Sequence, residues 1–115
     1  MIATALLDRA LEYAGGSHTL ADVDAGIQEG RFQEWTGDAS VIVTEIRETP
    51  QQKILLFWLA SGELEELRAM ALPICEWGKS VGCVKAQLVG RLGWQRSAIL
   101  KDGWKVTSVL MEREL

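Results

Sequence analysis

Apolar residues recur at helical spacing at the start of the chain. Between residues 2 and 14 they fall near every third or fourth position, and Gly15-Gly16 interrupts the run, which predicts a helix that ends at the glycines. Thr19 stands where a second helix would begin, with Asp22 placed to complement its N-terminus. A second apolar stripe then runs towards Gly30, a natural stop. The pattern therefore predicts two short helices in series.

The period changes after the second helix. Residues 31–35 alternate between apolar and polar, and residues 41–47 are rich in β-branched side chains, so both segments are expected to be strands. Residues 54–60 are apolar at both alternating positions. A strand of that kind is covered on both faces, so we expect it in the middle of a sheet with helices packed on it.

A longer helix is expected to follow. Ser61 is predicted to cap it, and apolar residues between positions 64 and 81 step by three and four until Gly82 ends the run. Pro73 lies inside this stretch and is expected to kink the helix or split it in two. The remaining pattern predicts a strand at 86–89, a helix at 93–102 and a final strand at 105–112.

The element order is α-α-β-β-β-α-β-α-β, which predicts an α+β fold in a single domain spanning residues 1–115. The strands at 54–60 and 86–89 are expected to be parallel, because a helix joins them. One mixed sheet should hold the segments 41–47, 54–60, 86–89 and 105–112. The side chains expected in the core are Leu56, Trp58, Leu67, Ile74, Leu88 and Val109.

Composition and charge narrow the classes of function. Hydrophobic residues make up 48% of the chain and charged residues 24%, as in globular domains. The net charge of −4 argues against DNA or RNA as the partner, because nucleic-acid-binding proteins present a basic face. No run approaches the ~20 apolar residues of a membrane span, and the first residues are charged too early for a signal peptide. We expect a cytoplasmic protein with no membrane partner.

The sequence predicts no metal site. Cys75 and Cys83 do not form a CxxC pair, and His18, the single histidine, is far from both in sequence. A zinc site or a Cys–His nucleophile needs such residues in a cluster. We therefore expect two reduced thiols, which suits the cytoplasm.

The last third of the chain carries a more specific pattern. It reads Gly90-Arg91-Leu92-Gly93-Trp94-Gln95-Arg96, then Leu100-Lys101-Asp102-Gly103-Trp104. Together with the element order, this segment resembles the fourth helix and sixth strand of the GCN5-related N-acetyltransferase (GNAT) superfamily, where a glycine–aromatic pair closes the helix and opens the strand. The superfamily's first strand and last strand have no counterpart here. The chain is also similar to small acetyltransferase-like proteins of tailed bacteriophages.

The resemblance implies a cofactor site at the start of the helix after residue 60. In the superfamily, a glycine-rich loop there opens backbone N–H groups to the pyrophosphate of acetyl-CoA. This chain offers only Ser61 and Gly62 as cofactor-binding residues, and Glu63, Glu65 and Glu66 crowd the first helical turn. Because these carboxylates would repel a polyanion, we expect no cofactor, with acetyl-CoA as the alternative.

The resemblance also implies a tyrosine general acid at the position of Ile99, which cannot donate a proton. Glu34 and Glu45 are the strand carboxylates that could act as a general base, although a solvent-facing strand position is the simpler explanation of both. The interaction surface is predicted at Arg91, Trp94 and Arg96, since exposed aromatics beside arginine are favoured in protein interfaces. Burial in the core is the simpler role for Trp94.

These departures from the superfamily pattern leave rival functions. The first is a non-enzymatic phage or prophage protein with a degenerate acetyltransferase-like fold, which binds another protein, associates with itself or assembles into a virion in a bacterial host. The second is an acetyl-CoA-dependent N-acyltransferase with a divergent cofactor loop. A third, an antagonist of a host protein, is neither supported nor excluded by composition. The loop at residues 60–66 favours the first, so we expect a binding protein rather than an enzyme.

Overall fold

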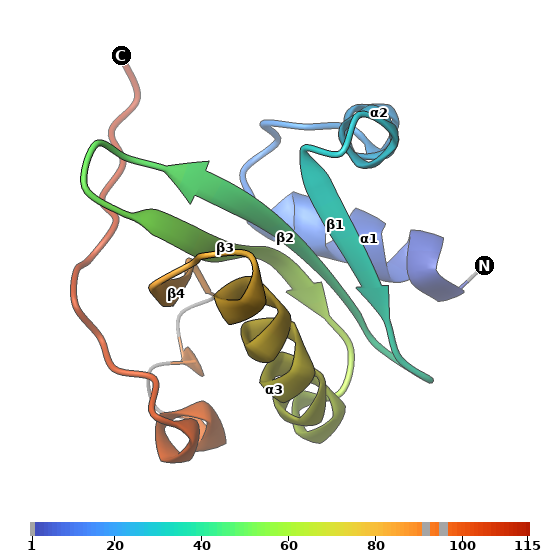
Figure 1. Ribbon diagram of the computed structural model, residues 1–115. Helices are drawn as coiled ribbons and strands as arrows, with labels where there is room; N and C mark the ends of the chain where they lie inside the picture. The colour runs from blue at the N-terminus through green and yellow to red at the C-terminus, as the bar shows by residue number, and fades with distance from the viewer. Residues whose placement is uncertain (1, 91–92, 95–96) are drawn as a thin grey trace.

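A four-stranded mixed sheet organises the protein. The computed structural model describes residues 2–90, 93–94 and 97–115. The sheet lies between two helices on one face and one long helix on the other (Figure 1). In chain order the elements are α1 (Ile2–Tyr13), α2 (Leu20–Gln28), β1 (Phe32–Thr36), β2 (Val41–Glu48), β3 (Lys53–Ser61), α3 (Leu64–Ser80), β4 (Lys85–Leu88) and the short 3₁₀ helix η2 (Ala98–Asp102).

The strands lie in the order β1-β2-β3-β4. β1 and β2 are antiparallel, as are β2 and β3, and the register of the second pair shifts at Val43/Thr44. β3 and β4 are parallel, with Ile54 opposite Lys85 and Phe57 opposite Leu88. This confirms the expected α+β architecture, in which the long helix joins two parallel strands.

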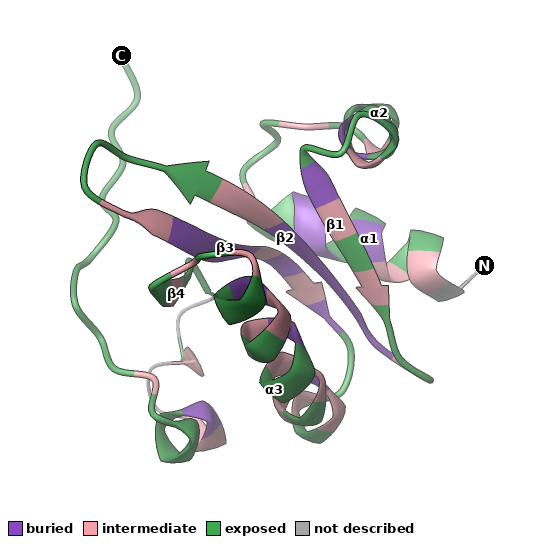
Figure 2. Cartoon of the chain, in the orientation of Figure 1, coloured by how far each residue is buried: buried purple, intermediate pink, exposed green. Residues whose placement is uncertain are grey.

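The hydrophobic core has two halves, one on each face of the sheet. Val23 of α2, Val43 of β2 and Leu59 of β3 lie in the half beside α1 and α2. Leu55 and Phe57 of β3 lie in the half that Ile74 of α3 completes. Buried residues therefore follow one another along β2 and β3 (Figure 2). The prediction that residues 54–60 form a strand covered on both faces is confirmed.

The predictions of individual core residues are confirmed only in part. Leu56, Leu67 and Ile74 are buried, as expected. Trp58 and Leu88 are half-buried, because Trp58 covers the outer part of the α1 face and β4 lies at the margin of the sheet. Val109 is 79% exposed, so its predicted burial is wrong.

One helix start follows its local sequence and another does not. Thr19 and Asp22 form the expected capping box, with the Asp22 carboxylate 2.8 Å from the Thr19 N–H. Ser61 does not cap α3. It is the last residue of β3, pairs with Val41 and is 1% exposed. The N-cap is Glu63, whose side chain makes no capping bond.

Helix α3 continues through Pro73, so of the two outcomes predicted there, a kink or a split, the split is wrong. Packing explains the continuity. Ile74 is 1% exposed, and a Cβ atom at Gly78 would lie 2.7 Å from Leu55 Cδ2 on β3. Leu67, on the other side of the proline, is buried in the same half of the core. Packing therefore holds both sides of the proline against the sheet and outweighs the lost backbone hydrogen bond.

The end of the chain departs most from expectation. In the region predicted to be a helix at 93–102, the structure describes the 3₁₀ helix η2 at Ala98–Asp102. Gly103 takes the expected left-handed conformation, and Trp104 packs against Phe57 at 5.5 Å between ring centroids. The strand predicted at 105–112 is wrong, because residues 105–115 lie outside the sheet and are exposed (Figures 1 and 2). β-branched side chains favour a strand only where a neighbouring strand is available.

Glu66 joins the first turn of α3 to the β1–β2 hairpin. Its carboxylate accepts hydrogen bonds from the N–H groups of Asp38 and Ala39, at 2.8 and 2.9 Å. The nearby Ser40 hydroxyl and the Ala39 N–H lower the pKa of this carboxyl below its ordinary value. A Cβ atom at Gly37 would lie 2.7 Å from the Glu66 carboxyl carbon, so a side chain there would displace the carboxylate from these hydrogen bonds.

A first prediction concerns the α3 face of the core. Ile74→Ala should lower the free energy of unfolding by about 2–5 kcal/mol, because it leaves a cavity between α3 and β3. Leu72→Ala, two residues away at a side chain that is 68% exposed, should change it by less than about 0.5 kcal/mol. Urea unfolding of both variants measures the difference. Equal losses would show that α3 does not pack as described.

A second prediction concerns Glu66. Its lowered pKa means that its contribution to stability is complete above the unfolded-state pKa, near 4.5, and is lost as the pH falls through the lower folded-state pKa. The melting temperature of Glu66→Gln should therefore lie below that of the parent at neutral pH and approach it in acid. Glu76→Gln removes the same charge from an exposed site on α3. If both variants show the same pH dependence, the hairpin contact makes no contribution.

Candidate functional site

Strand β3 extends beyond its neighbour β4. β3 has nine residues and β4 has four, and the parallel pairing covers only Ile54–Phe57. Along residues 58–61 the structure describes no strand beside β3 on the β4 side. Backbone N–H and C=O groups left at such an edge need another partner, either water or a ligand. The two strands therefore separate at a point where an extended ligand could take the place of a strand.

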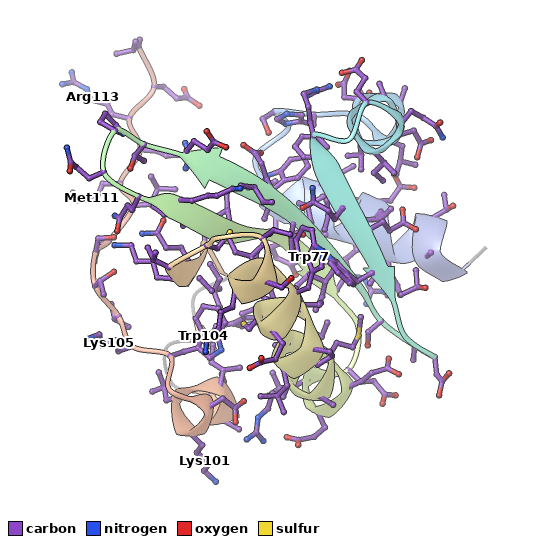
Figure 3. The ribbon with its side chains drawn as sticks, viewed as in Figure 1. Trp77, Lys101, Trp104, Lys105, Met111 and Arg113 are labelled. Atoms are coloured by element: carbon purple, nitrogen blue, oxygen red, sulfur yellow. The ribbon has the colours of Figure 1, made fainter. Side chains whose placement is uncertain are left out.

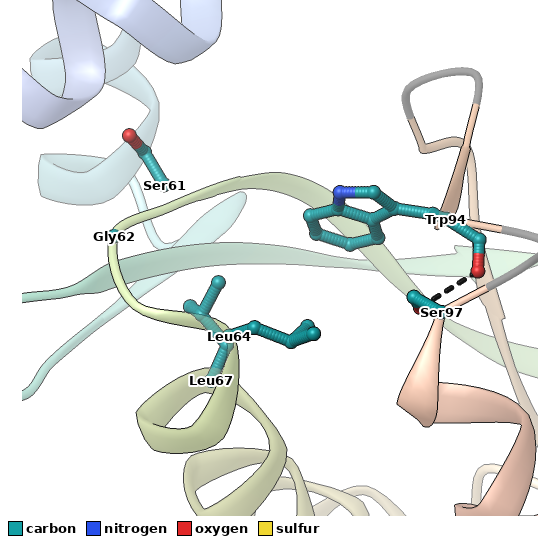
Figure 4. A pocket seen from close by; sticks show the side chains of 6 residues that line it. All are labelled: Ser61, Gly62, Leu64, Leu67, Trp94 and Ser97. Carbon is teal, nitrogen blue, oxygen red and sulfur yellow. Dashed lines mark hydrogen bonds between the residues drawn. The ribbon is translucent and has the colours of Figure 1, made fainter.

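A recess of about 110 Å³ lies beside this separation. Figure 4 shows the Trp94 indole facing Leu64 and Leu67 across it. The Ser97 hydroxyl donates a 2.7 Å hydrogen bond to the Trp94 carbonyl, which fixes the turn that carries the indole. The recess is lined by Ser61, Gly62, Leu64, Leu67, Trp94 and Ser97. Its volume suits a small apolar group rather than a whole cofactor.

The N-terminus of α3 opens onto the recess. The first N–H groups of a helix have no intrahelical partner, and the N-cap Glu63 supplies no side-chain bond to them. Such a helix start attracts anions through its free N–H groups and its dipole. Leu64, the first helical residue, lines the recess, so the free N–H groups lie close to its wall.

The glutamates of this turn are directed elsewhere. Glu66 is bound to the hairpin, and Glu65 forms an ion pair with Arg68 at 3.0 Å. Arg68 also contacts Asp102 at 2.8 Å, which lowers the pKa of the Asp102 carboxyl. Two of the three carboxylates expected to repel a polyanion are thus engaged in contacts with other parts of the chain. Only Glu63 has no described side-chain partner.

Arg68 has a further effect on the recess. By joining α3 to Asp102 of η2, it fixes the 3₁₀ helix that begins next to Ser97. The guanidinium side chain is 22% exposed and the carboxylate 28%. The contact therefore holds the wall formed by Trp94 against the α3 wall formed by Leu64 and Leu67.

Ser61 and Gly62, the expected cofactor-binding residues, both line the recess. The Ser61 hydroxyl is buried without a hydrogen-bond partner among the described residues, and Figure 4 shows it pointing away from Leu64 and Trp94. Ser61 therefore offers backbone atoms only. Gly62 has φ +133°, and a Cβ atom there would lie 2.3 Å from the Ser40 hydroxyl. Its role is to let the β3–α3 turn pass close to the hairpin.

The candidate bases lie on the other face of the sheet. Glu34 of β1 pairs with Val43, and Glu45 of β2 pairs with Phe32. Val43 and Phe32 belong to the core beside α1 and α2, so the two glutamates share that face. Neither lines the recess, and their catalytic role stays a prediction. Ile99, at the position expected for a general acid, is 9% exposed in η2.

The predicted interaction surface is described only in part. Trp94 is half-buried and packs against the α3 side of the core, in agreement with the simpler role considered for it. Arg91 and Arg96 lie outside the described residues. Sequence reasoning missed Leu64, Leu67 and Ser97 as lining residues. The available signal was the unequal length of the strands predicted at 54–60 and 86–89.

The described residues provide no group of three or more His, Cys, Asp or Glu side chains that could hold a metal ion. Cys75 and Cys83 are both free thiols. Burial, with a smaller effect from Glu76, raises the pKa of Cys75. Among the helices described, none has both the length and the apolar character to cross a membrane.

Known proteins resemble this chain in structure rather than in sequence. No family model matches the sequence. No curated protein matches it significantly. A protein from Thermus thermophilus superposes with a TM-score of 0.67 at 11% identity, over 99% of this chain and 88% of its own. A Trypanosoma brucei acetyltransferase gives 0.64 at 14% identity, over 97% and 92%.

A third similar structure is glucosamine-6-phosphate N-acetyltransferase from Arabidopsis thaliana, with a TM-score of 0.60 at 16% identity, over 86% of this chain and 80% of its own. The expectation of no cofactor is overturned by these neighbours, since two of them are acetyltransferases and the superfamily takes acetyl-CoA. Identities this low establish the fold alone. The chain has the mixed α+β fold of the GNAT acetyltransferases.

Proposed function

We propose that this protein binds acetyl-CoA at the separation of β3 and β4 and acts as an N-acyltransferase with a divergent cofactor loop. The observation that supports this most directly is the β3 edge beyond Phe57, which lacks a described neighbour where the α3 N-terminus and the apolar recess meet. An extended, amide-containing chain that ends in phosphates, with an apolar arm next to them, would match all three features.

Different described residues would bind different parts of acetyl-CoA. Backbone groups along residues 58–60 would pair with the amides of the cofactor, as a neighbouring strand would. The free N–H groups at the start of α3 would hold phosphate oxygens. Leu64, Leu67 and Trp94 would pack against the apolar part of the cofactor arm next to the phosphates. The acyl group would lie farther along the β3 edge, towards Phe57, where β4 pairs with it. When bound, acetyl-CoA supplies an activated acyl carbonyl to an amine.

The chain has fewer side chains suited to proton transfer than to cofactor binding. Ile99 cannot protonate a departing thiolate, so this proton would come from solvent. Glu34 and Glu45 lie on the sheet face opposite the recess. A base there could act only on an amine that approaches from the α1 side. We therefore expect binding to be retained better than turnover.

Ile99 also favours a second candidate, a non-enzymatic role in which a phage- or prophage-encoded domain binds another protein or assembles into a virion. The apolar side chain is buried at the position where the superfamily has its general acid. In that case the fold would serve recognition, and an acyl-CoA molecule at the recess would be bound without transfer.

The third prediction tests the site by thermal stability. At a hundred times its dissociation constant, acetyl-CoA should add ~2.7 kcal/mol to stability and raise the melting temperature by several degrees. Trp94→Ala removes one wall of the recess and should abolish most of this increase. Trp77→Ala is the matched control, because Trp77 packs against Trp35 on the same face, outside the recess lining. Each variant is compared with itself, with and without ligand.

Two further measurements separate the candidates. Backbone amide NMR shifts at residues 61–66 should change on titration with acetyl-CoA, and release of free CoA in the presence of amines reports transfer. Binding with CoA release supports the enzyme, whereas binding without release supports the non-enzymatic role. The absence of any saturable shift in the parent protein would exclude the proposed site.

A further inference from the structure

Ser40 is a buried serine at the end of the β1–β2 hairpin. The residue is 2% exposed, and its backbone carbonyl accepts a 2.8 Å hydrogen bond from the Gly37 N–H across the turn. The next residue, Val41, is fully buried and pairs with both β1 and β3. Because the backbone is held on both sides, the Ser40 hydroxyl has a fixed position that is shielded from water.

This hydroxyl holds the start of α3. It accepts a 3.0 Å hydrogen bond from the N–H of Glu63, which is the N-cap residue of the helix. The N–H groups of the residues that follow begin the helix and have no intrahelical partner. The bond to Ser40 therefore fixes the residue immediately before the N–H groups that would receive the phosphates of acetyl-CoA.

A second contact holds the same helical turn from the same hairpin. The Glu66 carboxylate accepts hydrogen bonds from the N–H groups of Asp38 and Ala39, so the hairpin contacts α3 at its N-cap and again three residues later. Gly62 passes so close that a Cβ atom there would lie 2.5 Å from the Ser40 Cα. The hairpin and the start of α3 lie together at one end of the molecule (Figure 1). These contacts give the turn one position relative to the sheet.

The same turn borders the recess. Gly62 and Leu64, on either side of the N-cap residue, both line it (Figure 4). Ser40 and Glu66 are not among the described residues that form its lining. A ligand in the recess can therefore reach the turn while the contacts with the hairpin remain formed.

We propose that Ser40 positions the phosphate-binding turn: its buried hydroxyl anchors the N-cap of α3 and so directs the first helical N–H groups at the phosphates of acetyl-CoA. Donors that are already fixed before a ligand binds give higher affinity, because no further ordering is needed. Ser40 itself would not touch the ligand, so it is a positioning residue. This role rests on the proposed binding of acetyl-CoA at the same turn.

The fourth prediction compares two ligands of Ser40→Ala. Acetyl-CoA should bind this variant about five- to tenfold more weakly than the parent, which is the effect of losing one buried hydrogen bond. S-acetylpantetheine has the same amides and acyl group without the phosphates, so its dissociation constant should change by less than about twofold. NMR titration measures both constants. A merely structural role of Ser40 would weaken the binding of both ligands alike, and that result would overturn the proposal.

Ser80→Ala is the matched control. The Ser80 hydroxyl donates a 2.6 Å hydrogen bond to the carbonyl of Trp77 near the opposite end of α3 (Figure 3). The control therefore also removes one bond between a serine hydroxyl and the backbone of this helix, but it should bind both ligands as the parent does. If Ser40→Ala binds acetyl-CoA as tightly as the parent, the role of Ser40 is wrong and the proposed function stands. If the parent binds no acetyl-CoA, both are wrong.

Amide hydrogen exchange of the parent protein gives a test that does not depend on the folding of a variant. The N–H of Glu63 is bonded to a buried hydroxyl, whereas the N–H of Leu64 lies at a helix start without an intrahelical partner. Glu63 should therefore exchange more slowly than Leu64 in the absence of ligand, and acetyl-CoA should slow the exchange of Leu64. Exchange of Glu63 as fast as that of Leu64 in the ligand-free protein would overturn the anchoring role of Ser40.

Discussion

The burial of β3 on both faces is the constraint on which the rest of this structure depends. Leu59 packs towards α1 and α2, whereas Leu55 and Phe57 pack towards α3. A strand covered in this way cannot lie at the margin of a sheet, so β2 and β4 flank it and a helical layer covers each side. The contact of Gly78 with Leu55 brings α3 close enough to complete the second layer.

The candidate site follows from the unequal lengths of β3 and β4. β3 must reach Ser61 to pair with Val41 and to deliver Gly62 beside the hairpin. β4 ends at Leu88, so the distal part of β3 lies beyond it. The start of α3 and the Trp94 turn border this same gap. The fold itself therefore brings together an open strand edge, an uncapped helix start and an apolar wall, without any ligand.

The glutamates of α3 show why local charge is a poor guide to a binding site. In sequence they form an acidic turn that should repel phosphate. In the structure, Glu66 binds the hairpin and Glu65 pairs with Arg68, which also contacts Asp102. The same residues therefore stabilise the walls of the recess. The charge that a ligand would meet depends on where each carboxylate points, and this is decided by contacts between residues far apart in sequence.

The sequence by itself determined the elements whose signals are local. The spacing of hydrophobic residues identified α1, α2, the first three strands and the parallel β3–α3–β4 unit. Thr19 with Asp22 marked a helix start. These patterns can be seen in the sequence because they depend on neighbours within one turn or strand. Tertiary structure alone decided that Ser61 ends β3, that α3 continues through Pro73 and that residues 105–112 stay outside the sheet. Each of these depends on a partner distant in sequence: Val41 for Ser61, the packed β3 face for α3, and a neighbouring strand edge for the tail.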